Sequence, residues 1–514
     1  MKKSSRQGFI IDGVVYALLA LIVSSFFYSV SPNGYDTQGF DQSCFYTIGR
    51  GVLNGAVPYV DYFDNKGPLT YLIFAGIALF DDYKISMFAA QIIINFVTMV
   101  ILSAFLKESD SGKNRFAVII FFFVYYIFVS SEPGLYTEDI VVPFLILSYL
   151  FTYKVAERYG KEKCFVPKYS YVVSIAFWIV LLIRVNNAMI IAGLLFVIGI
   201  MLLANRDLKS FFSLITSFMI IGLILCLPVI LWLAKENALY DCLYESFLIN
   251  FEYSNGLETI PKKTLFFGFN SIFCFCFWGM LVLGIFGLIL YFAKAKTDAE
   301  KWFSFAMLVA LVFSVIAIST INYSYYHYLT TMIVSSFFPF MMNLSKLLGE
   351  DTKANKIIRT GFLVLMILAL VGLTAKDCRE NTISAGKNNA VISRYQIIDS
   401  VEDKVFYEIG DMIPDDDRDS VFMIDGNPKF YALNKIQPCK RILVCRNLFT
   451  YVNEDLHEEY ISYFTEDEPK WLVVRNGIDN IEDVELANIL DKKYKLLYQS
   501  QSFSQDFYCL YVIS

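Results

Sequence analysis

Long runs with no or almost no charged side chains limit how this chain can fold more than any other feature. They lie at residues 10–30, 85–106, 116–131, 140–153, 171–204, 211–234, 266–292, 302–320, 328–345 and 360–375. A helix crosses a bilayer core with roughly 20 apolar residues. The run at 171–204 is too long for one crossing, and Arg184, Asn186 and Asn187 interrupt its middle. We therefore expect two short spans there, and eleven spans in all.

Two apolar segments need a separate interpretation. Residues 69–80 would form a helix of only about 18 Å, which is short for a crossing. We predict a juxtamembrane or re-entrant helix there. The basic start followed by the run at 10–30 resembles a signal peptide, but no small-x-small cleavage pattern follows before Pro32. We interpret this run as an uncleaved first span.

Composition agrees with a polytopic α-helical membrane protein. Hydrophobic residues make up 56% of the chain and charged residues 18%, whereas soluble proteins average about 45–50% and about 25%. The 48 Phe and 34 Tyr suit lipid-facing surfaces and aromatic belts. These values exclude a soluble enzyme and a disordered chain. The net charge of −6 makes nucleic acid an unsuitable partner.

Charge divides the chain into two parts. Residues 376–514 hold 16 basic and 25 acidic side chains, whereas residues 1–375 hold 27 and 24. The apolar runs also stop near residue 375. We predict a membrane region at 1–375 and an acidic soluble domain at 376–514.

The soluble part alternates short β-rich runs with amphipathic helix. Strands are expected at 420–425, 470–475, 494–499 and 507–513, with a helix at 481–491. This indicates a small α/β domain that caps the site or binds acceptor. Its four cysteines allow three full disulfide pairings, and the sequence does not choose among them; they are Cys378, Cys439, Cys445 and Cys509.

Ionisable residues are nearly absent from the predicted spans, which argues against an ion-coupled transporter. Polar residues instead gather in the first outer loop, residues 31–68. The charged members of this loop are Asp36, Asp41, Arg50, Asp61, Asp64 and Lys66. A site at the outer membrane face, within reach of a lipid-anchored substrate, follows from this distribution.

Lys66 stands directly before the short helix. Gly67 is acceptable as an N-cap and Pro68 suits the first helical position. A helix N-terminus beside an ammonium group binds anions, and a lipid phosphate is the obvious anion at this depth. The alternative is a solvated loop whose lysine reaches the lipid headgroups without binding a substrate.

The stretches 41–51 and 55–71 resemble the first outer loop of bacterial GT-C glycosyltransferases, a group related to protein O-mannosyltransferases and lipid A aminoarabinose transferases. The resemblance implies an enzyme that takes a sugar from a polyprenyl-phosphate carrier and transfers it on the outer face. It implies that Asp41 is the catalytic carboxylate and that residues 66–69 engage the donor phosphate. Gln42 departs from the adjacent acidic pair that some members carry.

Two further segments resemble this group more weakly and complete the candidate site. Glu138 and Asp139 begin a span, where acidic residues also satisfy the helix dipole, and His327 with Tyr328 lies in a tyrosine-rich segment that an aromatic belt would also explain. With Asp41 as catalytic base, the predicted substrate-binding residues are Lys66, Asp61, Asp64, Arg50, Glu138, Arg184, His327 and Tyr328.

Sugar transfer from a polyprenyl phosphate requires acidic and basic side chains of the kinds found here. Displacing a polyprenyl phosphate from an anomeric carbon needs a base for the acceptor hydroxyl and cations for the phosphate, with Arg184 or Arg50 as the second cation. In-line attack would invert the anomeric centre. No cofactor is certain, and a divalent metal is compatible with the acidic residues. The expected partners are a polyprenyl-phosphate-linked sugar, an envelope glycan, lipid or protein acceptor, and the bilayer.

Two other classes of function fit the apolar layout. One is an envelope polysaccharide polymerase or ligase, or a flippase for lipid-linked sugars; the other is a non-catalytic membrane scaffold. A flippase should line its spans with polar residues, which these spans lack. A scaffold should tolerate loss of charge in the first outer loop.

The distribution of basic residues predicts the topology. With the N-terminus inside, the cytoplasmic segments carry 20 Lys and Arg and the outer segments 7, which places residues 376–514 outside. Reporter fusions after residues 292, 350 and 376 should therefore report inside, inside and outside. A cytoplasmic signal at 376 would contradict the span count.

Overall fold

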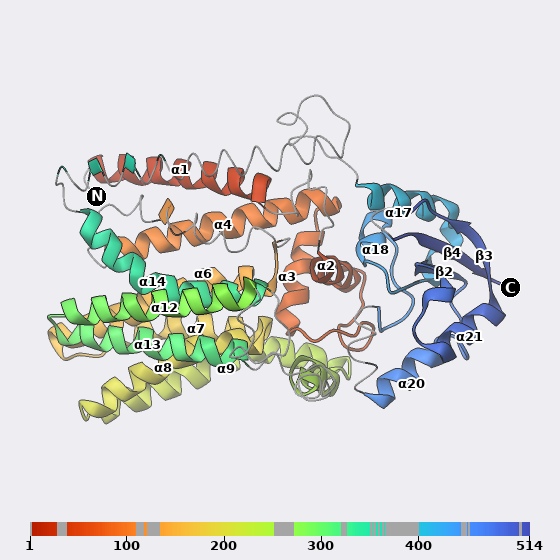
Figure 1. Cartoon of the computed structure of the whole chain (residues 1–514). Coiled ribbons are helices and arrows are strands. Elements are labelled where there is room, and N and C mark those ends of the chain that lie inside the picture. The colour runs from red at the N-terminus through yellow and green to blue at the C-terminus, as the bar shows by residue number, and fades with distance from the viewer. Residues whose placement is uncertain are drawn as a thin grey trace. The chain divides into compact units, whose positions relative to one another are not determined.

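The computed structural model describes residues 3–27, 39–108, 134–250, 272–319, 326–349, 400–443, 453–502 and 506–514, with isolated positions between them. Long apolar helices form most of it (Figure 1). They are α1 Lys3–Phe27, α4 Tyr83–Glu108, α6 Thr137–Glu162, α7 Pro167–Ile183, α8 Val185–Ala204, α9 Leu208–Lys235, α12 Ile272–Lys294, α13 Asp298–Ser319 and α14 Leu329–Gly349.

The predicted polytopic α-helical class is confirmed. Among the described residues, six helices are long and apolar enough to cross a membrane, and four shorter helices are also apolar. The predicted spans at 116–131 and 360–375 lie mostly outside the described residues, so the total of eleven stays a prediction. The predicted boundary at residue 375 lies outside them as well.

The break at Arg184 is confirmed. Arg184 is at once the C-cap of α7 and the N-cap of α8, with an extended backbone at φ −159° and ψ 121°. A single non-helical residue therefore separates the two helices. An arginine in a continuous apolar helix would be costly to hold in lipid, whereas a helix end brings free backbone groups and polar neighbours.

The first outer loop contains more helix than predicted. The short helix is confirmed as α3, Pro68–Ala78, with Gly67 as its N-cap. Residues 31–68 were expected to be a loop, but Phe40–Leu53 form a further helix, α2, which is a correction. Gly49 and Gly51 lower its intrinsic helix propensity. Packing of its apolar side chains, such as Phe45 against Phe74 of α3, overrides that propensity.

The chain divides into two compact units. One comprises Met1–Ser31, Phe88–Val229 and Pro261–Arg394; the other comprises Pro32–Met87, Ile230–Ile260 and Tyr395–Ser514. The second unit therefore combines the first outer loop, a middle segment and the C-terminal residues. Three segments distant in sequence form one packed body.

The C-terminal residues form the predicted small α/β fold. Its strands are β1 Val421–Ile424, β2 Trp471–Arg475, β3 Tyr494–Gln499 and β4 Tyr508–Ile513, in the sheet order β1-β2-β4-β3. β1 and β2 are parallel, and the other pairs are antiparallel. All four strands match predicted segments.

Helices cover both faces of this sheet (Figure 1). α20 Glu454–Ser462 and α21 Val484–Lys493 pack on one face, and α17 Val401–Met412 and α18 Lys429–Asn434 pack on the other. Burial on both faces explains why β1 is a continuous apolar run, since alternation would require one solvated face. The predicted helix at 481–491 corresponds to α21, while α17, α18 and α20 were not predicted.

A buried cluster of charges fixes α17 within this unit. Asp403 pairs with Lys84 and Lys429, each at 2.7 Å, and Lys429 lies 3.3 Å from Glu402. Burial alone would raise the pKa of Asp403, but the Lys429 and Lys84 ammonium groups hold it well below its ordinary value. This cluster ties the start of α4 to the C-terminal fold.

The close approach of α2 and α3 depends on Gly49. A Cβ atom there would lie 2.5 Å from the Phe74 carbonyl carbon and 2.6 Å from the Ala75 nitrogen, so the backbones would have to separate. We expect Gly49→Ala to destabilise the protein by about 1–3 kcal/mol. The measurement is the thermal unfolding midpoint of purified protein in detergent.

Gly76, in α3, is the matched control. A Cβ atom at this position meets nothing within 4 Å. Gly76→Ala should leave the midpoint unchanged or raise it, because alanine favours helix over glycine by about 1 kcal/mol. Equal midpoints for the two variants would contradict the packing argument.

Candidate functional site

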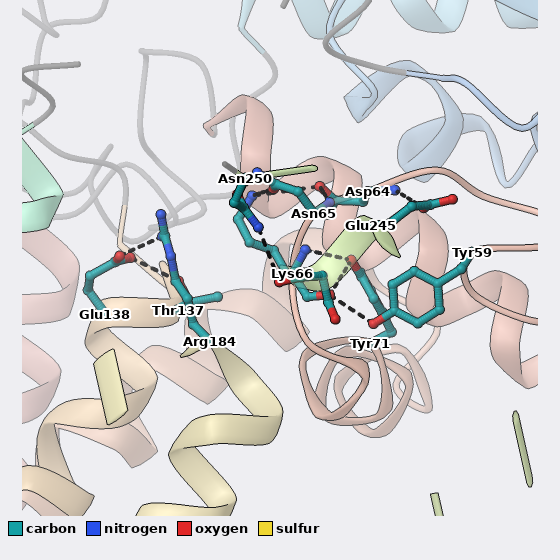
Figure 2. Close-up of polar contacts among 11 residues, drawn as sticks. Tyr59, Asp64, Asn65, Lys66, Tyr71, Thr137, Glu138, Arg184, Glu245 and Asn250 are labelled. Carbon is teal, nitrogen blue, oxygen red and sulfur yellow. Dashed lines mark hydrogen bonds and ion pairs between the residues drawn. The ribbon is translucent and has the colours of Figure 1, made fainter. Parts of the chain in front are cut away.

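Lys66 lies buried at the N-terminus of α3, with 8% of its surface exposed (Figure 2). Its ammonium group donates to the Asn65 side-chain oxygen at 2.5 Å and lies 3.6 Å from Asp64 Oδ1. It also lies 5.3 Å from the ring centroid of Phe45 on α2. The lysine is therefore fixed by contacts within the protein and is not a solvated surface side chain.

Asp64 is the buried carboxyl group beside this lysine. Burial raises its pKa above the ordinary value, the Lys66 ammonium opposes that shift, and the Asp41 carboxylate adds to it. Asp41 lies in the first turn of α2 and is partly exposed. Asp64 thus interacts electrostatically with both Lys66 and Asp41.

Two tyrosines fix the main chain at Lys66. The Tyr59 hydroxyl donates to the Lys66 carbonyl oxygen at 2.8 Å, and the Tyr71 hydroxyl lies 3.3 Å from both the nitrogen and the carbonyl oxygen of Lys66. The two rings meet edge to face with centroids 5.7 Å apart. Lys66 is thus held through its backbone as well as its side chain.

Arg50 and Asp61 make other contacts. Arg50 lies in the last turn of α2, nine residues from Asp41 and so about 13 Å along the helix axis, and donates to the Lys435 carbonyl oxygen at 2.5 Å. Asp61 is exposed, and its carboxylate accepts from the Val57 N–H at 2.6 Å. Asp36 lies outside the described residues.

A second cluster forms where α6 begins and where α7 meets α8 (Figure 2). Arg184 Nη1 donates to Glu138 Oε1 at 2.5 Å and to the Thr137 hydroxyl at 3.1 Å. The guanidinium carbon lies 5.1 Å from the ring centroid of Tyr328. Three predicted site residues from distant parts of the sequence therefore meet here.

His327 belongs to this second cluster through ring contacts. It lies in the short 3-10 helix η2, Tyr326–Tyr328. Its ring stacks on Tyr136 with centroids 4.0 Å apart and an interplanar angle of 8°, and it meets Tyr328 at 4.4 Å. Asp139 accepts from the Tyr136 N–H at 3.2 Å and so caps α6. This agrees with the alternative that the acid serves the start of the helix.

The sequence did not single out Glu245 or Arg441, which support the first-loop residues. Glu245 lies in the π-helix η1, Tyr244–Leu248, is fully buried, and forms an ion pair with Arg441. Burial alone would lower the pKa of Arg441, but the carboxylates of Glu245 and Glu459 raise it above its ordinary value. The available signal was a carboxylate at 245 within an otherwise largely apolar stretch.

The part of the chain that the structure describes contains no candidate metal site. No three His, Cys, Asp or Glu side chains there are grouped so that they could hold a metal ion. Cys439 and Cys509 are free thiols, whereas Cys378 and Cys445 lie outside the described residues. Cys276, within α12, is also free.

Comparison with known proteins gives two positive findings. The family model described as dolichyl-phosphate-mannose-protein mannosyltransferase matches residues 65–232. The fold is similar to the crystal structure of ArnT from Cupriavidus metallidurans bound to undecaprenyl phosphate, with TM-score 0.58, 8% identity and 98% of each chain covered. The apo state of that protein gives a TM-score of 0.56 at 9% identity and the same coverage. No curated protein matches the chain.

Buried Glu138 and partly buried Arg184 should be strongly coupled. Removing one partner of a buried ion pair costs about 3–5 kcal/mol, because the other charge is left uncompensated. We expect Arg184→Gln to lower thermal stability strongly, and Glu138→Gln combined with Arg184→Gln to recover part of the loss. The measurement is a double-mutant cycle on unfolding midpoints.

The exposed pair of Arg158 and Glu162, one helical turn apart in α6, is the matched control. Exposed pairs contribute about 0–1 kcal/mol. Coupling of the same size in both pairs would show that Glu138 and Arg184 are not held as a buried unit.

Proposed function

We propose that the chain is a membrane glycosyltransferase of the GT-C type, which moves a sugar from a polyprenyl-phosphate carrier to a cell-envelope acceptor. The transfer takes place on the outer face of the membrane and inverts the anomeric centre. The carrier class is supported by the undecaprenyl phosphate bound to the solved protein of similar fold. The matching family model, which covers Lys66 and α3, supports a lipid-phosphate donor.

The position of Lys66 is the observation that carries this proposal. A buried ammonium group directly precedes the N-terminus of an apolar helix, and both attract a phosphate group. In the described structure the Lys66 ammonium group hydrogen-bonds Asn65 and forms an ion pair with Asp64. A donor phosphate would take over part of these contacts. Because burial raises the pKa of Asp64, this carboxyl group takes up a proton more readily than an ordinary one when a second anion arrives.

Asp41 acts as the general base. The acceptor hydroxyl oxygen forms a bond to the anomeric carbon, while the bond from that carbon to the phosphate oxygen breaks and its electron pair leaves with the polyprenyl phosphate. The hydroxyl proton passes to the Asp41 carboxylate. Of the two neighbouring carboxyl groups, Asp41 is partly exposed and Asp64 is buried, so Asp41 is the one that a substrate can reach.

The second cluster provides groups suited to substrate binding. Arg184 is oriented by Glu138 and Thr137, and Tyr328 lies under its guanidinium group. A planar guanidinium held in place is well suited to bind phosphate or carboxylate oxygens with two parallel hydrogen bonds. We assign Arg184, Glu138, His327 and Tyr328 to substrate binding.

Substitution of Lys66 tests the phosphate assignment. Lys66→Ala should raise the KM for the lipid-linked donor far more than the KM for the acceptor, because only the donor carries the phosphate. Lys66→Arg should retain part of the activity, since the charge remains while the geometry changes. Equal losses toward both substrates, measured with purified enzyme, would indicate a structural role.

Substitution of Asp41 tests the base. Asp41→Asn keeps size and hydrogen bonding but removes basicity, so transfer should fall by about 10²–10⁴-fold while expression and donor binding stay near wild type. Asp36→Asn, outside the stretch that resembles the family, should have a much smaller effect. Near-normal transfer by Asp41→Asn would remove this residue from the mechanism.

The function itself can be tested in cells. Mass spectrometry of surface glycans with and without the gene should show the loss of one sugar from one class of glycan, lipid or protein. A change in polysaccharide chain length without loss of a sugar would favour a polymerase or ligase. Unchanged glycans would contradict a role in envelope glycosylation.

A further inference from the structure

Glu245 and Arg441 form an ion pair, and each of them also hydrogen-bonds the main chain of the first outer loop. All of these residues belong to the same compact unit. Glu245 is completely buried, and its second carboxylate oxygen accepts from the Asp64 N–H at 3.3 Å. Arg441 Nε donates to the Tyr59 carbonyl oxygen at 2.8 Å. The pair therefore contacts both ends of the segment 59–64.

Arg441 also holds the middle of this segment. Its carbonyl oxygen accepts from the Phe63 N–H at 2.9 Å, and its guanidinium carbon lies 5.5 Å from the ring centroid of Phe63. Its remaining nitrogen, Nη1, donates to Glu459 at 2.7 Å, which orients the guanidinium group from within the C-terminal domain. Arg441 thus contacts this turn through both its main chain and its side chain.

Tyr59 links this turn to Lys66. Its backbone has φ +74°, in the left-handed region that bulky residues rarely adopt. Such a conformation persists only where the surroundings enforce it, and it is frequent at functional sites. Here the Tyr59 N–H donates to Tyr62 O, its carbonyl accepts from Arg441, and its hydroxyl donates to Lys66 O. Contacts from the Arg441 side chain therefore reach the Lys66 backbone through one residue.

We propose that Arg441, oriented by Glu245 and Glu459, is a positioning residue that holds the 59–66 turn so that Lys66 can bind the donor phosphate. This inference rests on the proposed function, because Lys66 is taken as the phosphate-binding group. It assigns the C-terminal part of the chain an indirect role in donor binding, through a residue that does not itself touch the donor.

The geometry favours positioning over simple stabilisation. A buried ion pair is weak evidence for stability, since desolvation offsets the attraction between the charges. The described side-chain hydrogen bonds of Glu245 and Arg441 go either to a carboxylate–guanidinium partner or to the main chain of residues 59–64. A role limited to stability would not require that the contacts converge on the turn before Lys66.

The experiment compares variants of the full-length protein in nanodiscs. Arg441→Lys keeps the charge but loses the planar fork, so it cannot reach Tyr59, Glu245 and Glu459 together. Tyr59→Phe leaves all charges in place and removes only the hydroxyl that contacts Lys66. Arg475→Lys is the matched control, because Arg475 pairs with Asp506 inside the same domain and has no described contact with the turn.

Two quantities are measured: binding of undecaprenyl phosphate by native mass spectrometry, and amide hydrogen exchange of peptides covering residues 59–66. Arg441→Lys and Tyr59→Phe should weaken binding of this probe by about 10- to 100-fold and speed exchange in the turn. Both should keep an unfolding midpoint close to that of Arg475→Lys, which should match wild type in every measurement.

Other results would overturn the inference. The inference is wrong if both variants bind undecaprenyl phosphate and exchange amide hydrogens as the wild type does. It is also wrong if binding weakens only in proportion to a loss of folded protein. If Arg441→Lys does not fold, Tyr59→Phe decides alone, since it disturbs no ion pair. Failure of the wild-type protein to bind undecaprenyl phosphate would instead contradict the proposed function, and the exchange measurements would still test whether Arg441 holds the turn.

Discussion

A bilayer core offers no hydrogen bonds to a polypeptide backbone, so a chain that crosses it must satisfy its own peptide groups within helices. In this protein that constraint leaves helix ends as the places where polar chemistry can gather. Asp41 lies in the first turn of α2, Lys66 directly precedes α3, Glu138 lies in the first turn of α6, and Arg184 separates α7 from α8. Each position combines a charged side chain with backbone groups that the helix does not satisfy.

A second constraint acts on the charges themselves. Isolated charges are costly to bury, and here three buried or partly buried cations lie beside carboxylates: Lys66 beside Asp64, Arg184 beside Glu138, and Arg441 beside Glu245. A phosphate that binds Lys66 must therefore compete with a neighbouring carboxylate. Such a site discriminates by charge and geometry, because only a ligand that replaces the lost hydrogen bonds can bind tightly.

The three segments of the second unit depend on one another. The first outer loop supplies Lys66 and Asp64, the π-helix η1 supplies Glu245, and the C-terminal domain supplies Arg441. The Lys84 and Asp403 pair connects the start of α4 to the same domain. The C-terminal fold therefore takes part in shaping the turn before Lys66, beyond its own sheet and helices.

The sequence by itself determined the apolar helices, the break at Arg184, the start of α3 and the four strands, because these depend on local composition, caps and periodicity. It also showed that Asp41, Asp64 and Lys66 lie in the same polar loop. Only the tertiary structure decided that residues 40–53 are helical, because packing of α2 on α3 outweighs two glycines. It alone joined Arg184 to Glu138 and Arg441 to Glu245, since these partners lie 46 and 196 residues apart and chain folding, not local pattern, brings them together.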